Sequence, residues 1–516
     1  MSVATMPPPG GYVSKVDSAL NRNKLTVLTV ILMVIAAAAP FTVIGGGATA
    51  GWAVTEVLGI PDAYVAMAVA LGVFSVGYTE MSRHIVNSGA FYAYVAQGLG
   101  RITGLGAAGV AVLAYNFMQI GLYGGFGAVA SGFLKDRWGV DLAWWLVAAI
   151  GWAVIAVLGV LSIELSGAVL GVLLGAEVVI ALLFAVVEVL HPAGGTVTYD
   201  TLNPSQLFSA GTGAALATAV AGFVGFESTA VYSEETRNAK RNIPRATYLS
   251  LIIIGLLYAF CSWAMSVAAG PANIIALSAE HGSETMFTLV DPHMAKIWLD
   301  LGHGLFITSL FAALLSFHNT AARYTFSLGR ERVLPGWFGT AGRRFRAPLW
   351  GSLTQSMLAI AVLAVFAVTG LDPFVYLFFF FWWTVTGGFG VLILMTITSL
   401  AVVVYFVRHR TGEVARVPAW RRFVAPVLGF LVLLVVLIVT LWEFDTLLGV
   451  AADSLWRWIF PAAFATAAVV GAGWAAVLRA TSPAVYRGIG QGASADLLAG
   501  QSDGGAAHRA EPAAAR

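Results

Sequence analysis

Residues 207–233 read LFSAGTGAALATAVAGFVGFESTAVYS, an apolar run that carries a single charged side chain, Glu227. A helix that crosses the hydrocarbon core of a bilayer needs roughly 20 apolar residues, so this run is longer than one span requires. Glycines interrupt it at residues 222–225, GFVG, and glycine lets a backbone unwind at low steric cost. The run therefore predicts a membrane-spanning helix that is opened partway along its length.

The rest of the chain repeats the same apolar character. Of its 516 residues 59% are hydrophobic and only 10% are charged, and the mean hydropathy is +0.83. Soluble proteins carry roughly 25% charged residues, so too little polar surface remains for a water-soluble particle of this size. We therefore expect an all-α polytopic membrane protein with about twelve spanning helices and no globular soluble domain. The candidate spans are 25–56, 62–82, 102–133, 142–161, 163–190, 207–233, 246–269, 297–322, 349–369, 373–407, 423–442 and 456–478.

The first run holds a second glycine interruption, IGGG at residues 44–47, five helices before the one at 222–225. Unpaired backbone groups are costly in hydrocarbon, so irregular backbone at membrane depth must line a cavity. Transporters built from inverted repeats place their interrupted helices in such corresponding positions. An unwound segment offers N–H groups to an anion and carbonyls to a cation, which suits a zwitterion such as an amino acid. Alternatively, the glycines only allow close helix packing; their matched placement favours the binding site.

Basic residues predict the orientation, because cytoplasmic loops are enriched in Lys and Arg. With the N-terminus inside, the predicted cytoplasmic segments contain 24 of the 28 Lys and Arg residues. The opposite side keeps Lys135, Arg137, Lys296 and Arg457. An even number of spans with both termini in the cytoplasm follows, and the composition suggests the plasma membrane of a bacterium, its inner membrane.

Several other classes of protein lack support in the residues. The net charge of +2 does not favour a nucleic-acid partner, and the single Cys261 excludes an intrachain disulfide or a cysteine metal cluster. No H-E-x-x-H or G-x-S-x-G motif occurs, and Gly-Lys, which a phosphate-binding loop needs, is absent. We therefore expect no enzyme activity and no cofactor. An ion channel or a polytopic membrane enzyme remains as the alternative to a transporter.

Four stretches in the right order resemble the amino acid–polyamine–organocation (APC) superfamily. Residues 222–227 (GFVGFE), followed by 241–246 (RNIPRA), are similar to the family's F-x-G-[FV]-E and N-P-x-R-x-I-P-x-A, with Ala239 in place of the first proline. Residues 78–94 resemble its passage after the second helix, and residues 323–335 its passage after the eighth, with Arg332 replacing a glycine.

This resemblance implies a LeuT-type fold, a 5+5 inverted repeat with helices 1 and 6 broken and two further helices. It also implies a secondary active transporter of amino acids or amines that works by alternating access. The expected organisation comprises a cytoplasmic tail, two repeats, two additional spans and a disordered cytoplasmic tail. Their bounds are 1–23, 24–206, 207–410, 411–479 and 480–516.

The resemblance also indicates where substrate binds, between helices 1, 3, 6 and 8. In the first helix it points to a region and not to single donors, because two ways of counting disagree by a few residues; a proline there has no N–H to donate. The candidate residues are Ala39, Pro40, Phe41, Thr42, Val43, Ile44, Gly45 and Gly46 in helix 1, Tyr115 and Gln119 in helix 3, Phe223, Val224 and Gly225 in helix 6, and Phe317 in helix 8.

Two acidic residues inside the spans are candidates for coupling or gating, since intramembrane acids usually mark ion or substrate paths. Glu177 lies deep in the fifth helix and could exchange a proton, pair with a cation or face an amine; it could also be a neutral structural hydrogen-bonding group. Glu227 could contact an amine or act as a gate, or it could cap freed backbone amides. We favour the proton over sodium as the coupling ion. For His303 and His318 we expect structural hydrogen bonds.

Overall fold

The chain folds into helices throughout the part that the structure describes. Only one isolated bridge, between Leu25 and Thr236, departs from helix and loop there. The structure is a computed structural model that describes residues 25–161, 163–342, 347–370, 380–409, 414 and 416–492. The predicted tail 1–23 and all but the first residues of the predicted tail 480–516 lie outside the described residues. So do some of the basic residues that predict the orientation: Lys15, Arg22, Lys24, Arg343, Arg344, Arg346, Arg410, Arg509 and Arg516.

Among the described residues, eleven helical segments are long and apolar enough to cross a membrane. Each of the twelve predicted runs overlaps a helix, but the fourth, α7 (Trp144–Val160), has only 17 residues. The eleven segments are α1 to α3 (Val27–Thr55), α4 (Ile60–Ser82), α6 (Arg101–Trp138), α8 (Ile163–Leu190), α10 with α11 (Thr212–Val231), α12 (Ala239–Ala269), α15 (Lys296–Arg330), α16 (Leu349–Thr369), α17 (Trp383–Arg408), α18 (Ala425–Trp442) and α20 (Trp456–Thr481).

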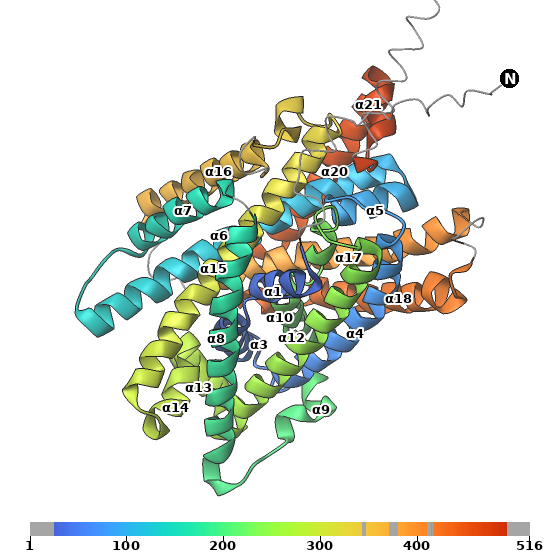
Figure 1. The fold of residues 1–516 in the computed structure, drawn as a ribbon. Coiled ribbons are helices and arrows are strands. Elements are labelled where there is room, and N and C mark those ends of the chain that lie inside the picture. Colours follow the sequence, from blue (N-terminus) through green and yellow to red (C-terminus); the bar gives the residue numbers. More distant parts are fainter. Residues whose placement is uncertain are drawn as a thin grey trace, which may run out of the picture.

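Short helices connect the long ones. Four of them prove important below: α5 follows the second span, α13 and α14 precede α15, and α21 follows the last span (Figure 1). The short helices are α5 (Ala90–Leu99), α9 (Pro204–Leu207), α13 (Ile274–His281), α14 (Thr285–Val290), α19 (Phe444–Leu448) and α21 (Pro483–Gly488).

Helix packing separates a core from a lipid-facing shell. The long helix α6 packs against α5, α15, α17 and α20, while α7 and α16 lie side by side on the outside (Figure 1). In the most apolar stretch of the α10 segment 89% of residues are buried, against 17% in α20. Apolar residues that remain exposed on a spanning helix face the acyl chains, so α10 belongs to the core and α20 to the periphery.

The first spanning segment changes direction at Ala39. Helix α1 (Val27–Ala38) ends there with a left-handed backbone, φ 44° and ψ 69°, and α2 (Pro40–Thr42) begins at the next residue. Proline lacks the N–H that would continue the α1 ladder, and it disfavours α conformation in the residue before it. Residues 44–47, where the glycines predict an interruption, instead form part of a wider helical turn, Val43–Ala48, which leads into α3 (Thr49–Thr55).

The sixth run is interrupted within the predicted stretch 222–225. Helix α10 (Thr212–Phe223) ends at Phe223, Val224 is extended, and Gly225 has φ +119°. Residues with side chains rarely adopt such a positive φ, which explains the glycine. The following N–H groups bond to residues three positions back, and α11 (Ser228–Val231) is a single turn. Backbone bonds of an α-helix are therefore missing at this point.

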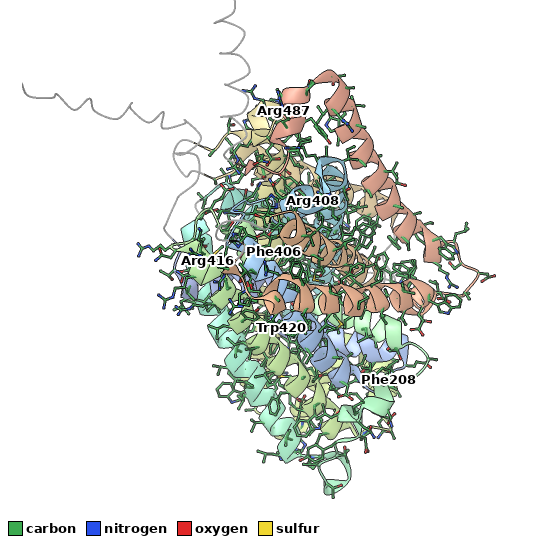
Figure 2. The ribbon with its side chains drawn as sticks, turned by 90° about the vertical axis from the view of Figure 1, so that its right-hand side faces the viewer. Phe208, Phe406, Arg408, Arg416, Trp420 and Arg487 are labelled. Carbon is green, nitrogen blue, oxygen red and sulfur yellow. The ribbon has the colours of Figure 1, made fainter. Side chains whose placement is uncertain are left out.

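The two ends of the molecule differ in their elements. In Figure 1 the short helices α13 and α14 lie at the lower left, whereas α5 and α21 lie at the upper right. The view turned by 90° shows Arg408 and Arg487 in the upper part of the molecule and Phe208, in the loop before α10, at the lower right (Figure 2). The end that contains α5 and α21 is called the basic end below, and the other the α13–α14 end.

Candidate functional site

A small cavity of about 50 Å³ lies between the two interruptions. Ala39 and Thr42 line it from the first spanning segment, and Val224 from the stretch after α10. Helix α6 adds Met118 and α15 adds Phe317. The cavity is thus enclosed by elements far apart in the sequence, and both departures from regular helix border it.

Five of the fourteen predicted binding residues line this cavity. They are Ala39, Thr42, Val43, Val224 and Phe317. The other nine do not, although most lie close by in the core. They are Pro40, Phe41, Ile44, Gly45, Gly46, Tyr115, Gln119, Phe223 and Gly225.

The first-helix residues divide between two faces. Phe41 belongs to an aromatic cluster with Phe184, Phe287 and Phe306, whose ring centroids lie 6.0 to 6.3 Å from its own. A methyl group at Gly45 would lie 3.0 Å from the terminal carbon of Met286. Residues four apart share a helix face, so Phe41 and Gly45 pack toward α8 and α14 while Thr42 and Val43 face the cavity.

Glu227 is fully buried beside the interruption of the sixth run. Its Oε1 accepts a hydrogen bond of 2.8 Å from the Tyr115 hydroxyl, and its Oε2 accepts one of 2.8 Å from the N–H of Gly225. The Tyr78 hydroxyl donates to its backbone carbonyl, also at 2.8 Å. Both carboxylate oxygens are therefore engaged by the protein, in the manner expected of a group that caps freed backbone amides.

Glu177 lies on α8 and is 1% exposed. The Ser309 side chain and the N–H of Phe41, the second residue after the turn at Ala39, are close to its carboxyl group. Among the described residues its Oε2 has no hydrogen-bond partner. The Thr42 N–H in turn donates to Ser309 Oγ at 3.4 Å. This buried carboxyl group thus contacts the first interruption from behind the cavity.

Gln119 takes part in a polar network between α6, α15 and α16. Gln355 donates to Gln119 and, at 2.7 Å, to Asn116 Oδ1, while His318 Nδ1 lies 3.5 Å from Gln119 Nε2. His318 Nε2 and Ser352 Oγ are 2.7 Å apart. The sequence analysis did not identify Gln355 or Asn116; two amides at such depth in apolar runs were the available signal, because buried polar groups need partners.

Buried ion pairs close the basic end. Arg330 binds Glu234 through two hydrogen bonds of 2.7 Å, and Arg323 binds Glu235 at 3.0 Å. Burial opposes ionisation of Glu234, but the hydrogen bonds and the charge of Arg330 outweigh it, so the pKa of Glu234 lies below its usual range. These two pairs join the segment after α11 to α15.

The chain beyond the last span packs onto the same end. Glu331 Oε2 accepts a hydrogen bond from the N–H of Gly490 at 2.8 Å, and its Oε1 accepts one from Gly492 at 2.7 Å. Ile489 is 1% exposed. Burial raises the pKa of Glu331. The sequence analysis predicts disorder from residue 480, whereas residues 483–492 form α21 and a buried segment, because backbone N–H groups meet a buried carboxylate there.

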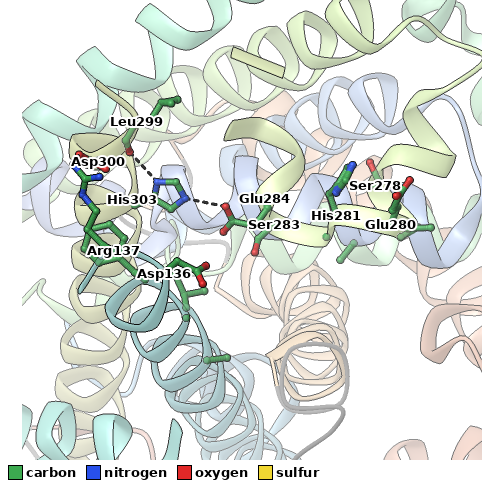
Figure 3. Close-up of a pocket in the computed structure, with 18 of the residues that line it drawn as sticks. Asp136, Arg137, Ser278, Glu280, His281, Ser283, Glu284, Leu299, Asp300 and His303 are labelled. Carbon is green, nitrogen blue, oxygen red and sulfur yellow. Dashed lines mark hydrogen bonds and ion pairs between the residues drawn. The ribbon is translucent and has the colours of Figure 1, made fainter. Parts of the chain in front are cut away.

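A much larger pocket of about 740 Å³ opens at the α13–α14 end (Figure 3). His303 Nε2 lies 2.8 Å from Glu284 Oε2, and its Nδ1 lies 2.9 Å from the Leu299 carbonyl. Arg137 pairs with Asp300 in the same wall. The two predicted structural histidines thus both make hydrogen bonds. Acidic and basic side chains alternate around this pocket, in contrast to the apolar inner cavity.

No group of three or more His, Cys, Asp or Glu side chains that could hold a metal ion is found among the described residues.

The profile of the family described as amino acid permease matches residues 25–468. The chain belongs to the amino acid permease family. This confirms the resemblance to the APC superfamily that the sequence motifs indicate. With eleven apolar helices among its described residues, this permease is a multi-pass membrane protein.

Curated relatives of the permease are transporters of several amines. A branched-chain amino acid permease of Lactococcus lactis is 25% identical over 384 residues, which cover 69% of this chain and 76% of the relative. A low-affinity putrescine importer of Escherichia coli is 25% identical over 186 residues, 36% of this chain and 37% of the importer. A cationic amino acid transporter of Arabidopsis thaliana is 27% identical over 150 residues, 29% of this chain and 24% of the transporter.

Proposed function

We propose that this permease is a secondary active transporter that moves amino acids or related amines across the plasma membrane by alternating access. The observation that carries the proposal is the cavity between Ala39 and Val224, which lies where the first and sixth spanning runs depart from regular helix. Backbone groups released there can bind the amine and carboxylate of a substrate. The two interruptions five helices apart support the LeuT-type 5+5 inverted repeat.

The orientation follows from the basic residues. The basic end, with Glu234–Arg330 and Glu235–Arg323, would face the cytoplasm together with both termini, and the pocket near His303 would face the outside. In this arrangement the structure represents a state closed to the cytoplasm. Opening inward requires both buried ion pairs to separate.

Coupling is assigned to Glu177. Its carboxyl group is buried and contacts the N–H of Phe41, so a change in its protonation alters the interactions of the first interruption. We assign the proton, in preference to sodium, as the coupling ion; exchange of one substrate for another is the alternative mode. Glu227 serves as the fixed cap of the sixth-run interruption and links it to Tyr115.

The purified protein in proteoliposomes tests the proposal. Vesicles loaded with an unlabelled amino acid should accumulate the labelled compound from outside transiently, because a carrier exchanges the two through one site. Uptake should saturate and discriminate between L and D forms. An ion channel would give conductance without counterflow, and that result would remove the transporter assignment.

A further inference from the structure

The inner cavity has an uncharged wall. Among the described residues that line it there is no Asp, Glu, Lys, Arg or His. Most of the wall is hydrocarbon from side chains such as Met118, Leu122, Phe317 and Val385. Transfer of a charged side chain into such surroundings without a partner is strongly unfavourable.

The nearby carboxylates do not supply such a partner. Both oxygens of Glu227 accept hydrogen bonds from Tyr115 and Gly225, and Glu177 does not line the cavity. Glu234 and Glu235 are paired with Arg330 and Arg323 at the basic end. A second amine on a substrate, as in a diamine or a basic amino acid, would therefore meet no carboxylate among the described residues that line the cavity.

The size of the cavity points to a small solute. The cavity measures only about 50 Å³, and side chains from the first and sixth spanning segments, α6, α15 and α17 enclose it, so a small solute fits it better than a large one. Larger side chains require the wall to move, and Phe317 is the largest side chain on the α15 side of the wall.

Thr42 is the polar side chain of the cavity wall that is available for a hydrogen bond to the substrate. Thr42 is 3% exposed, lines the cavity, and its Oγ1 has no hydrogen-bond partner among the described residues. The other two threonines there, Thr218 and Thr384, donate to backbone carbonyls of their own helices. A buried hydroxyl without a partner is unusual, which makes Thr42 a contact for a bound polar group.

We infer that the substrates are neutral amino acids with small apolar side chains, with the Thr42 hydroxyl bound to the polar end and Met118, Leu122 and Phe317 around the side chain. This inference rests on the proposed transport function. It excludes diamines and basic amino acids as good substrates of this chain.

Competition against labelled L-alanine uptake in proteoliposomes tests the substrate class. Valine and other small neutral amino acids at 100-fold excess should abolish uptake, while arginine, lysine, putrescine and glutamate should leave it nearly unchanged. Inhibition by putrescine or arginine as strong as that by valine would overturn the inference and leave the transport function intact. Absence of uptake and counterflow for every compound would overturn both.

Thr42→Val tests the polar contact with a residue of the same shape. Loss of a hydrogen bond to a charged group should raise KM for alanine about tenfold, and Thr42→Ser should restore it. Thr398→Val is the matched control, because Thr398 is also buried and its hydroxyl also has no hydrogen-bond partner in the described ranges, but it lies outside the cavity. Equal KM values for Thr42→Val and Thr398→Val would contradict the assignment.

Phe317→Ala tests the size limit. Removal of the ring enlarges the cavity, so leucine and phenylalanine should gain at least severalfold in kcat/KM relative to alanine. Phe311→Ala on the same helix, outside the cavity lining, is the control and should leave the ratio as it is. An unchanged ratio in Phe317→Ala would show that this ring does not limit substrate size.

Discussion

At the scale of single residues, the buried carboxyl groups have different surroundings. Glu227 is held by Tyr115 and Gly225, whereas one oxygen of Glu177, beside the first interruption, has no hydrogen-bond partner within the part of the chain that the structure describes. A group that is fully hydrogen-bonded stabilises one geometry, and a group with a free oxygen can respond to protonation or to a ligand. We therefore expect substitution at Glu177 to change the pH dependence of uptake, and loss of the hydrogen bonds to Glu227 to change stability.

Glu177→Gln should flatten the dependence of uptake on pH, because the amide keeps the shape of the side chain but cannot take up or release a proton. The measurement is initial uptake of labelled substrate between pH 5 and pH 8. Glu188→Gln is the matched control, since Glu188 is another buried carboxyl of α8 that does not line the cavity. A pH profile that stays as in the unmodified protein would remove Glu177 from the coupling step.

Tyr115→Phe should destabilise the protein by about 1–3 kcal/mol, because Glu227 Oε1 loses its donor while it remains buried. Thermal unfolding in detergent measures the loss. Tyr123→Phe is the comparison, because the Tyr123 hydroxyl on the same helix has no hydrogen-bond partner among the described residues. Equal effects of the two substitutions would argue against the cap role of Glu227.

At the scale of elements, α15 joins most of the features described here. Its middle carries Phe317 at the cavity and His318 in the polar network, and its end carries Arg323 and Arg330 at the basic end. A shift of α15 would therefore move the cavity wall and the ion pairs together. This gives a physical route by which binding in the cavity can be linked to opening at the basic end.

Loss of the Glu234–Arg330 pair should lower the free energy of unfolding, and the size of this loss should depend on pH. Glu234→Gln leaves a buried guanidinium without its partner, which costs about 3–5 kcal/mol. The folded-state pKa of Glu234 is lowered from its usual 4.5, so the stabilisation is present above that pH and is lost as the pH falls through the lower value. Chemical denaturation of the unmodified protein and of Glu234→Gln should show a smaller difference in the free energy of unfolding below pH 4 than at pH 7. The control Glu280→Gln, at an exposed position, should have little effect at either pH.

Glu331→Gln should loosen the segment after α21, because an amide nitrogen cannot accept the hydrogen bonds that Gly490 and Gly492 donate. Cleavage by trypsin after the exposed Arg487, followed by mass spectrometry, should become severalfold faster. Cleavage at the same rate in both forms would contradict this role of the carboxylate.

At the scale of the whole molecule, the two ends differ enough to predict sidedness. A cysteine introduced at Glu280, beside the pocket at the α13–α14 end, should react with a membrane-impermeant maleimide in intact cells. One introduced at Arg487 should react only after the cells are opened. The natural Cys261 is buried and should not contribute. Labelling of the Arg487 position from outside would reverse the proposed orientation.

Much of the architecture could be predicted from the sequence, because a spanning helix must be apolar over its whole length and every predicted run overlaps a helix. In the sixth run the glycines predict an irregular backbone, and Gly225 has a positive φ that few other residues adopt. In the first run the glycines near Gly45 predict the irregular backbone, whereas the chain turns at Ala39, the first residue of the region predicted to bind substrate. Glycine permits an irregular backbone, but Pro40 forces one, since it lacks the N–H of a continuous helix.

The individual cavity contacts were harder to predict. The rotation of α6 about its axis decides whether the Gln119 side chain points into the cavity or toward Gln355. That rotation is set by packing against α15 and α16. The docking of Gly490 and Gly492 on Glu331 depends on three-dimensional proximity between segments more than 150 residues apart. Composition favours a disordered tail at this point, and one buried carboxylate is enough to order its first residues.

That docking has a practical consequence for anyone who fuses a fluorescent protein or an affinity tag to the downstream end. A methyl group on Gly492 would lie 3.3 Å from the guanidinium of Arg330, so a protein fused directly after Gly492 would lie beside the pair that separates in the proposed inward opening. A bulky domain fused at that position without a spacer would either hinder or favour separation of this ion pair, and it would change the rate of transport. The uptake rate of a tagged protein should therefore be compared with that of the tag-free protein before any kinetic comparison.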